Sequence, residues 1–439
     1  MNAQPEFARE LPATPSTPAI TRREWVSSIV AGTIGNAVEA FDWMIYTAFA
    51  IYFGKQFFPS DNPTVTLLSA FAVFAVGFAM RPLGGWAMGA FSDRFGRRSG
   101  LMVTILAMAG SSLIIAFLPT YSSIGILAPI LLTSLRMLQG LSVGGEYSAA
   151  TLFLAESAPP KRRGFFTSFQ FGSVAVGMLL SSAMSWAMAH YMSRSALEAW
   201  GWRVPFFIGG CGALVGFWMR RHVAETAAFE QLKREGRVNP RSLWWTWSHH
   251  PKAVLRLVGI TVLGAFSFYL FVSFMPVYAI RHAGAHPDDA FAASTVTIAI
   301  FMITQPLFGA LSDRIGRRPQ LIVFALGYLL FLYPVIRSIG PSFGSMLLVE
   351  CFGMLLYGLY TAIAPAVMAE LFPTEVRGVG IGAAYNLVVA LLGGTTPYLM
   401  TAAQAHQHEG WFIGYVCVGA LIGLVTFWRM PETVGIELK

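Results

Sequence analysis

The stretch GAFSDRFGRR at residues 89–98 returns almost unchanged as GALSDRIGRR at residues 309–318, an offset of 220 residues. A second pair, AESAPPKRRG from Ala155 and AELFPTEVRG from Ala369, repeats at an offset of 214 residues. Two markers at nearly equal offsets indicate an internal duplication. Because this repeat is far longer than one unit of a solenoid or propeller, we expect each copy to be a half of the molecule built from several elements.

The composition places the two halves in a membrane. Of 439 residues, 55% are hydrophobic and only 12% are charged, which is about half the charged fraction of a soluble domain. Apolar runs long enough to cross the ~30 Å hydrocarbon layer as helices occur about twelve times, at 26–53, 66–91, 99–118, 125–153, 165–189, 204–219, 254–280, 290–311, 320–336, 344–369, 378–401 and 411–429. The sequence therefore predicts an all-α integral membrane protein with twelve transmembrane helices in two pseudo-symmetric six-helix bundles.

The basic residues predict how the chain is oriented. A net charge of +8 would suggest a nucleic-acid partner in a soluble protein, but with the N-terminus inside, 23 of the 30 lysines and arginines fall on the cytoplasmic side. Cytoplasmic loops carry this excess, so we expect both termini in the cytoplasm and no nucleic-acid partner. The expected segments are an N-terminal tail, a first bundle, a cytoplasmic linker, a second bundle and a C-terminal tail, at 1–25, 26–219, 220–252, 253–430 and 431–439.

Neither cofactors nor enzymatic chemistry are indicated. The cysteines Cys211, Cys351 and Cys417 lie in separate apolar runs, so we expect no disulfide framework and no metal site. Residues 140–144 read GLSVG and match a hydrolase pattern, but that pattern needs a strand-to-helix elbow and here lies inside a transmembrane run. Small residues that allow close helix packing explain it better, and no P-loop for ATP is present.

Polar residues in the first span are candidates for function. Asn36, Glu39, Asp42 and Tyr46 are spaced by three, three and four residues, which places them on one stripe of a helix. Glu39 lies about 20 Å along the helix from Val26, so its carboxylate is expensive to hold charged at that depth.

Arginines follow in the second and fourth spans. Arg81 lies about 15 Å from Phe91, and Arg136 lies at a similar depth. The second half instead supplies mostly uncharged polar groups, among them Tyr269, Tyr357, Tyr385 and Asn386. Its acid Glu350 lies about 9 Å from the outer end of the tenth span, so we expect water to reach it.

Several motifs resemble one family. The two DRxGRR loops and the two sets of six spans resemble the major facilitator superfamily over essentially the whole chain. The stretches GNAVEAFDW, MRPLGG, RMLQGLSVGGEY and WGWRVPF, at 35–43, 80–85, 136–147 and 200–206, are similar to its metabolite:proton symporter family. The motif FFPS at 57–60 resembles that family's bacterial α-ketoglutarate permeases. The resemblance implies uptake across a bacterial inner membrane of small carboxylates, or of zwitterions in other branches, together with a proton.

Arg81 is the first candidate for substrate binding, because a guanidinium offers paired donors to a carboxylate and keeps its charge. The alternative is that Arg81 only neutralises Glu39 or Asp42. Arg136 serves either substrate binding or coupling. The rest of the expected substrate pocket consists of the tyrosines and the amide, Tyr46, Tyr269, Tyr357, Tyr385 and Asn386.

Glu39 and Asp42 are the candidate proton carriers. Burial favours the neutral form of a carboxylate and a nearby arginine favours the charged form, so a partner that moves during the cycle would load and release the proton. The alternative for Asp42 is a purely structural hydrogen bond between helices. The histidines lie in tails, loops or span ends, which leaves the carboxylates for this role.

The repeated loops are expected to gate the transport path at the cytoplasmic surface. Charged residues there would lock one conformation and separate in the other. The predicted gating residues are Asp93, Arg97, Glu146, Asp313, Arg317, Glu370 and Arg377.

The sequence thus predicts a monomeric symporter in the lipid bilayer that imports a small organic anion, such as α-ketoglutarate, driven by the proton gradient. The alternatives are a symporter of a zwitterionic osmolyte such as betaine or proline, a non-transporting sensor, and a membrane enzyme. Where the ketoglutarate branch carries a Gln-Lys pair this chain reads Pro276 and Val277, and MPVY at 275–278 resembles the zwitterion branch.

Overall fold

The computed structural model describes residues 22–238, 242–393, 396 and 409–438. Most of the predicted N-terminal tail, the end of the eleventh predicted span and Lys439 lie outside the described residues. The first half contains α1 (Arg22–Phe57), α2 (Pro63–Ala79), α3 (Arg81–Phe95), α4 (Arg97–Phe117), α5 (Tyr121–Ile124), α6 (Leu127–Ser157), η1 (Pro160–Arg162), α7 (Arg163–Tyr191), α8 (Arg194–Ala196), η2 (Leu197–Gly201) and α9 (Arg203–Arg220).

Two short helices, α10 (Ala227–Arg234) and α11 (Leu243–His249), lie in the predicted linker. The second half contains α12 (Pro251–Phe268), η3 (Tyr269–Phe274), α13 (Met275–His282), α14 (Pro287–Ile315), α15 (Arg317–Arg337), α16 (Phe343–Thr361), α17 (Ala364–Leu371), α18 (Arg377–Val388), η4 (Val389–Gly393) and α20 (Glu409–Arg429). Each of the twelve predicted spans coincides, over its described residues, with one of these helices or with consecutive helices.

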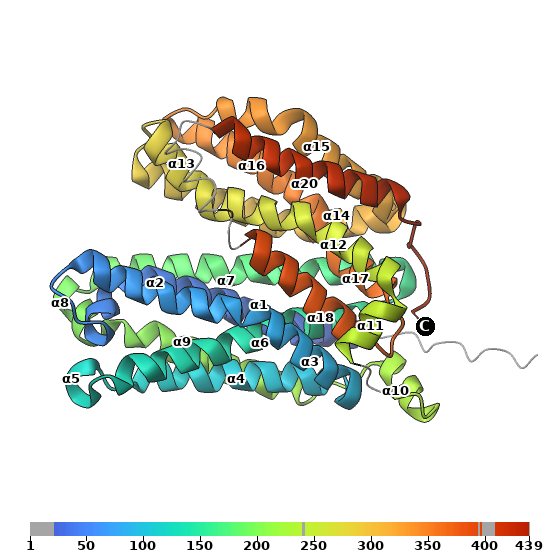
Figure 1. The fold of residues 1–439 in the computed structure, drawn as a ribbon, viewed down its shortest axis with the longest axis horizontal. Coiled ribbons are helices and arrows are strands. Elements are labelled where there is room, and N and C mark those ends of the chain that lie inside the picture. Colours follow the sequence, from blue (N-terminus) through green and yellow to red (C-terminus); the bar gives the residue numbers. More distant parts are fainter. Residues whose placement is uncertain (1–21, 239–241, 394–395, 397–408, 439) are drawn as a thin grey trace, which may run out of the picture.

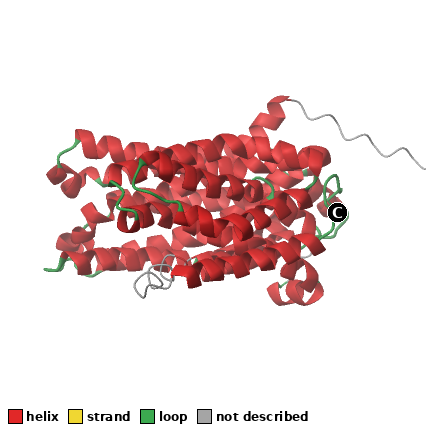
Figure 2. Ribbon diagram, turned by 90° about the horizontal axis from the view of Figure 1, so that it is seen from above, coloured by secondary structure: helices red, strands yellow, loops and turns green. Residues whose placement is uncertain are grey.

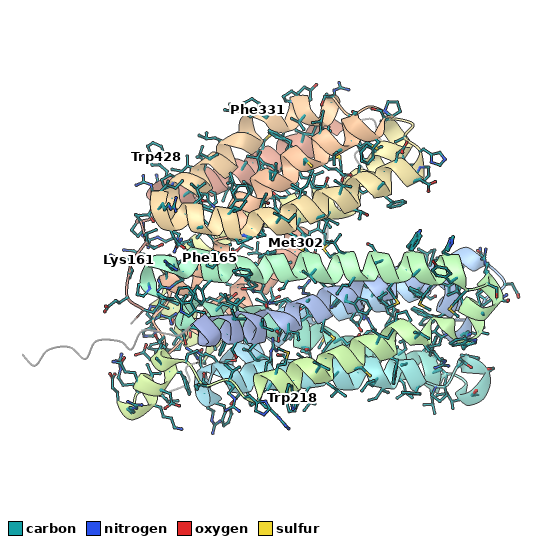
Figure 3. The ribbon with its side chains drawn as sticks, turned by 180° about the vertical axis from the view of Figure 1, so that it is seen from behind. Lys161, Phe165, Trp218, Met302, Phe331 and Trp428 are labelled. Carbon is teal, nitrogen blue, oxygen red and sulfur yellow. The ribbon has the colours of Figure 1, made fainter. Side chains whose placement is uncertain are left out.

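The described chain is helical, and no strand occurs in the described residues (Figure 2). Eight of the described helices or consecutive helices are long and apolar enough to cross a membrane, and the pair formed by α8–η2 and α9 makes a ninth span bent by 48°. Large apolar side chains such as Trp218, Phe331 and Trp428 are exposed on the outer faces (Figure 3). This surface suits lipid rather than water.

Both copies of the repeated loop have the same backbone. Gly96 ends α3 with φ 102°, and Gly316 ends α14 with φ 104°. Residues other than glycine rarely adopt this conformation. The next helix begins at once in each copy, at Arg97 and Arg317, so the duplication in sequence is also a duplication in structure.

The helices form two bundles that meet at one end (Figure 1). We call this the latch end; it carries the two glycine turns, α10, α11 and the described C-terminus. There α3 packs on α18 and α7 packs on α14. A Cβ on Gly89 would overlap the backbone of Gly378, and a Cβ on Gly164 would overlap the backbone of Gly309. Glycine at these positions allows the two bundles to make backbone contact.

Candidate functional site

Asp42 and Arg136 form a closed ion pair inside the first bundle. Asp42 of α1 accepts a hydrogen bond from Arg136 of α6 at 3.0 Å and another from Ser112 of α4 at 2.6 Å. Gln139 accepts from Arg136 at 2.6 Å and donates to Ser112 at 2.9 Å. Both charged side chains are at most 1% exposed. The four side chains thus form a ring of hydrogen bonds that balances two buried charges.

Aromatic rings cover the rest of Arg136. Its Nε and Nη2 have no hydrogen-bond partner among the described residues, but the guanidinium carbon lies 4.1 Å from the ring centroid of Tyr46 and 4.6 Å from that of Trp43. Cation–π attraction stabilises the charge there. The Tyr46 hydroxyl donates to the Ala70 carbonyl at 3.0 Å. Arg136 and Tyr46 therefore lie within the first bundle in this conformation. The sequence analysis leaves Arg136 open between substrate binding and coupling, and it expects Tyr46 in the substrate pocket, whereas here Tyr46 covers Arg136.

Arg81 and Glu39 form a looser pair. Arg81 Nη2 lies 3.6 Å from Glu39 Oε1, and the two side chains are 17% and 16% exposed. This distance is too long for a good hydrogen bond. The buried Nε of Arg81 has no hydrogen-bond partner among the described residues, and its guanidinium carbon lies 4.9 Å from the ring centroid of Phe78. Arg81 thus has an N–H group that makes no hydrogen bond to a described residue, and its side chain is partly exposed.

Side chains of the second bundle face this loose pair. The rings of Phe78 and Tyr269 meet edge to face, with centroids 6.0 Å apart. Phe78 also contacts the Arg81 guanidinium, and Tyr269 belongs to η3 of the second bundle. Arg81 and Glu39 therefore lie where the two bundles meet.

Stacked tyrosines close the contact between the bundles next to this site. Tyr385 of α18 stacks on Tyr147 of α6, with ring centroids 3.7 Å apart and ring planes 3° from parallel. The side-chain amide of Asn386 donates to the carbonyl of Gly144 at 2.9 Å. Both contacts join the second bundle to the first. The sequence analysis did not select Tyr147, although it ends the motif at 136–147.

Tyr357 of α16 also lies against the first bundle. It is 3% exposed, and its ring centroid lies 6.2 Å from that of Phe171 in α7. Its ring also stacks on Phe301 of α14 at 5.8 Å. The structure thus brings Tyr269, Tyr357, Tyr385 and Asn386 to the contact between bundles, whereas Tyr46 lies elsewhere.

At the latch end, Asp93 ties α3 to the start of α18. Its carboxylate accepts from the backbone N–H groups of Gly378 at 3.0 Å and Val379 at 2.9 Å. A carboxylate is favourable at a helix N-terminus. Arg97 and Arg377 bind one buried acid, Glu156, at 3.2 Å and 2.8 Å, and Arg97 also pairs with Asp93. We call this cluster the first latch: Asp93, Arg97, Glu156 and Arg377.

The second copy repeats this arrangement. Asp313 accepts from the backbone N–H groups of Gly164 at 2.9 Å and Phe165 at 2.8 Å, at the start of α7. Figure 3 shows Phe165 and Met302 where the two bundles face each other. Glu370 binds Arg163 at 2.7 Å and lies 3.7 Å from Arg317. We call this cluster the second latch: Asp313, Arg317, Glu370 and Arg163.

Glu146 lies outside both latches. It pairs with Arg220 of α9 at 2.5 Å and accepts a hydrogen bond from Thr104 at 2.5 Å, all within the first bundle. This differs from the prediction, which grouped Glu146 with the gating residues. The acid that corresponds to Glu370 is Glu156, which the sequence analysis missed together with Arg163. The signal was present, because Glu156 and Arg163 precede Glu370 and Arg377 by the same 214 residues as the decapeptide repeat.

Two acids outside the spans cap the helices that follow the glycine turns. Glu225 accepts from the backbone N–H groups of Arg97 and Arg98, and Glu432 accepts from those of Arg317 and Arg318. Burial raises the pKa of the Glu225 carboxyl. Burial also acts to raise the pKa of Glu432, but backbone N–H donors outweigh it, and the net pKa is lower than usual. Glu432 is thus charged at neutral pH, when it fixes the C-terminal segment to α15.

This fold and site define a membrane transporter of two pseudo-symmetric bundles, with a charged site between them and a latch pair at one end. The model of the Major Facilitator Superfamily matches residues 32–397. The chain belongs to this superfamily, and it is a transporter rather than an enzyme.

Relatives with named substrates are similar over nearly the whole chain. An alpha-ketoglutarate permease of Escherichia coli is 37% identical, covering 92% of this chain and 93% of its own length. A citrate-proton symporter of Salmonella typhi is 34% identical over 93% and 94%. A proline/betaine transporter of Salmonella typhimurium is 35% identical over 94% and 84%. These relatives make the chain a multi-pass membrane protein related to bacterial permeases.

A solved structure has the same fold. The proton:xylose symporter XylE, bound to 6-bromo-6-deoxy-D-glucose, superposes with a TM-score of 0.79 at 20% identity, covering 95% of this chain and 98% of XylE. The predicted fold class is therefore confirmed.

Proposed function

We propose that this chain is a proton-coupled symporter that imports a small dicarboxylate such as α-ketoglutarate by alternating access. The observation that carries the proposal is Arg81, a partly accessible arginine at the start of α3. Its Nε has no hydrogen-bond partner among the described residues, and it is loosely paired with Glu39 where the bundles meet. A guanidinium in this state binds a carboxylate in two parallel hydrogen bonds. The names of the relatives support both the organic anion and the proton.

Charge balance gives the reason for proton coupling. Arg81 and Glu39 together are neutral when the site is empty. A dicarboxylate that binds Arg81 adds two negative charges, which are costly inside a membrane. If Glu39 takes up a proton, Arg81 and one substrate carboxylate balance each other and one negative charge remains. Proton uptake by Glu39 therefore halves the uncompensated charge, and a second proton is needed to make the loaded site neutral.

We infer the conformation from the orientation in the membrane that the basic residues favour. With both termini in the cytoplasm, the latch end faces the cytoplasm. The closed latches then define a state that is open to the outside, and import requires both latches to separate. Asp42 and Arg136 take a coupling role in this scheme, because their pair is closed and both side chains are buried within the first bundle.

A zwitterionic substrate is the second candidate. The predicted pocket residues of the second half, Tyr269, Tyr357, Tyr385 and Asn386, are all uncharged, so a second carboxylate would meet neutral groups there. A zwitterion would instead bring its own cation, which the rings of Phe78 and Tyr269 suit. The proline/betaine relative supports this candidate.

The test is uptake of labelled α-ketoglutarate into proteoliposomes that are acidic outside, with succinate, citrate and glycine betaine as competitors. We expect uptake that needs the pH gradient and is blocked by dicarboxylates. Arg81→Ala should abolish it, whereas Arg194→Ala, at an arginine that is exposed and pairs only with Glu198, should leave it unchanged. Normal uptake by correctly inserted Arg81→Ala protein would refute the site, and uptake of betaine alone would refute the substrate.

A further inference from the structure

The second bundle buries one acid that the proposed mechanism does not use. Glu350 of α16 is 1% exposed, although its position near a span end predicts access to water. It lies about 10 Å along the helix from Phe343, at the end of the molecule opposite the latches. The acid is therefore enclosed by protein and not by solvent.

Glu350 lies on the face of α16 that packs against α14. Tyr357 and Thr361 follow it at intervals of seven and four residues, which places all three on one side of a helix. Each meets a residue of α14: Ser294 donates to Glu350 at 2.8 Å, Phe301 stacks on Tyr357, and Thr361 donates to Gln305 at 3.0 Å. The carboxyl group is thus held between two helices by a single side-chain hydroxyl.

Among the described side chains, the groups around Glu350 carry no compensating charge. Ser294 and Thr297 of α14 are neutral, and so is the thiol of the adjacent Cys351, which lies 3.5 Å from the Thr297 hydroxyl. From η3 and α15 the nearby side chains are Phe271 and Tyr328, which contact the next turn of α16 at Gly353.

The charged groups of α14 lie elsewhere. Asp288 and Asp289 are exposed at its start, and Asp288 lies 3.7 Å from His286 rather than near Glu350. Among the described residues no lysine, arginine or histidine forms an ion pair with Glu350. Every other buried acid in the described spans has an arginine partner, namely Asp42, Asp93, Glu146, Glu156 and Glu370.

We propose that Glu350 is a proton-binding site of the second bundle, occupied in this conformation and exchanging its proton toward the end opposite the latches. A lone ionised carboxylate enclosed in a membrane bundle is strongly disfavoured, and the group becomes neutral instead. One O–H bond forms at the carboxylate when the proton binds and breaks when it leaves. The second bundle then has a proton site of its own, in addition to the one proposed at Glu39 in the first.

The test uses the purified full chain in lipid vesicles and measures the infrared C=O stretch of protonated carboxylic acids as a function of pH. The wild type should show a component of this band at neutral pH that Glu350→Gln lacks. Glu198→Gln, at an exposed acid paired with Arg194, should leave the band unchanged. A neutral-pH band that is identical in wild type and Glu350→Gln would overturn the proposal.

A second variant keeps the test decisive if Glu350→Gln does not fold. Ser294→Ala removes the hydroxyl donor to the carboxyl group, so the Glu350 component should persist to more alkaline pH than in the wild type. An unchanged pH profile would count against the site. Because the measurement needs neither substrate nor gradient, it remains readable even if the proposed transport function fails.

Discussion

Arg81 and Arg136 differ in what each charge can still bind. Arg136 is enclosed by Asp42, Gln139 and two aromatic rings and is fully buried. Arg81 has one acid at 3.6 Å and remains partly exposed. A buried and satisfied pair suits a structural or coupling role, whereas a loose pair can exchange its partner for a ligand.

Replacing Glu39 by Gln should separate binding from coupling. The amide keeps the size of the side chain but carries no charge and takes up no proton near neutral pH, so Arg81 stays free for a carboxylate. We expect Glu39→Gln to retain exchange of labelled for unlabelled substrate across the membrane and to lose accumulation driven by a pH gradient. Both assays use the same proteoliposomes. Gradient-driven accumulation at the wild-type level would show that another group carries the coupled proton.

The Asp42–Arg136 pair should be costly to break from one side only. Asp42→Asn leaves a buried guanidinium charge without its carboxylate, which typically costs about 3–5 kcal/mol. Arg136→Met leaves the buried Asp42 carboxylate without its guanidinium partner. The double variant removes both charges, so its melting temperature in detergent should lie above that of either single variant. Melting temperatures that fall additively would mean that the two charges do not stabilise each other.

The type and the helical spacing of the residues identified the charged groups of the site from the sequence, but not which partner each of them binds. Glu39 and Asp42 share a stripe of α1, yet they bind Arg81 and Arg136 separately. The choice depends on how α3 and α6 are rotated about their axes, which local sequence does not specify. For the same reason Tyr46 was expected in the pocket and instead covers Arg136.

At the scale of elements, α3 and α18 touch through glycines. A side chain at Gly89 would overlap the backbone of Gly378, so Gly89→Ala should prevent the closed contact. The measurement is labelling of Ser148→Cys, which is 1% exposed as serine and lies near Gly382, by a thiol reagent in a chain whose three native cysteines are replaced by serine. Labelling should become faster.

Gly110→Ala is the matched control, because a Cβ there has no neighbour within 4 Å. It should leave the labelling rate of Ser148→Cys unchanged. If Gly89→Ala labels no faster than this control, the glycine contact does not hold the latch end closed.

The elements themselves were largely predictable. Apolar runs marked the spans because a helix must satisfy its backbone inside the bilayer. The sequence shows less clearly where a regular helix is interrupted inside a span, as it is by η3 between α12 and α13. Such interruptions depend on packing between helices, which the local sequence does not specify.

At the scale of the whole molecule, two equivalent latches hold one closed end. Asp93 caps the start of α18 and Asp313 caps the start of α7 through two backbone N–H groups each. They lie at two separate contacts between the bundles, α3 with α18 and α7 with α14, which we call the two faces. If the bundles move as rigid bodies, releasing one latch must loosen the contact on both faces.

Asp93→Asn tests this rigid-body movement. The amide is a weaker acceptor than the carboxylate and leaves Arg97 with less compensation, which should shift the opening equilibrium by about 1.5–3 kcal/mol, or roughly 10- to 150-fold. Two cysteine reporters detect opening at the two faces. Ser148→Cys lies next to α18. Ser168→Cys lies next to α14, because a Cβ on Gly309 would lie 2.8 Å from the Ser168 side chain. Rigid bundles predict faster labelling at both positions.

The reciprocal variant completes the argument. Asp313→Asn should speed labelling at the same two positions, and the double variant should multiply the two effects, since independent latches add their free energies to one equilibrium. If each variant instead exposes only its own face, each latch opens locally and the duplication supplies two separate gates. If both faces respond to either variant, the duplicated loop has one function, which is to set the balance between two conformations of the whole molecule.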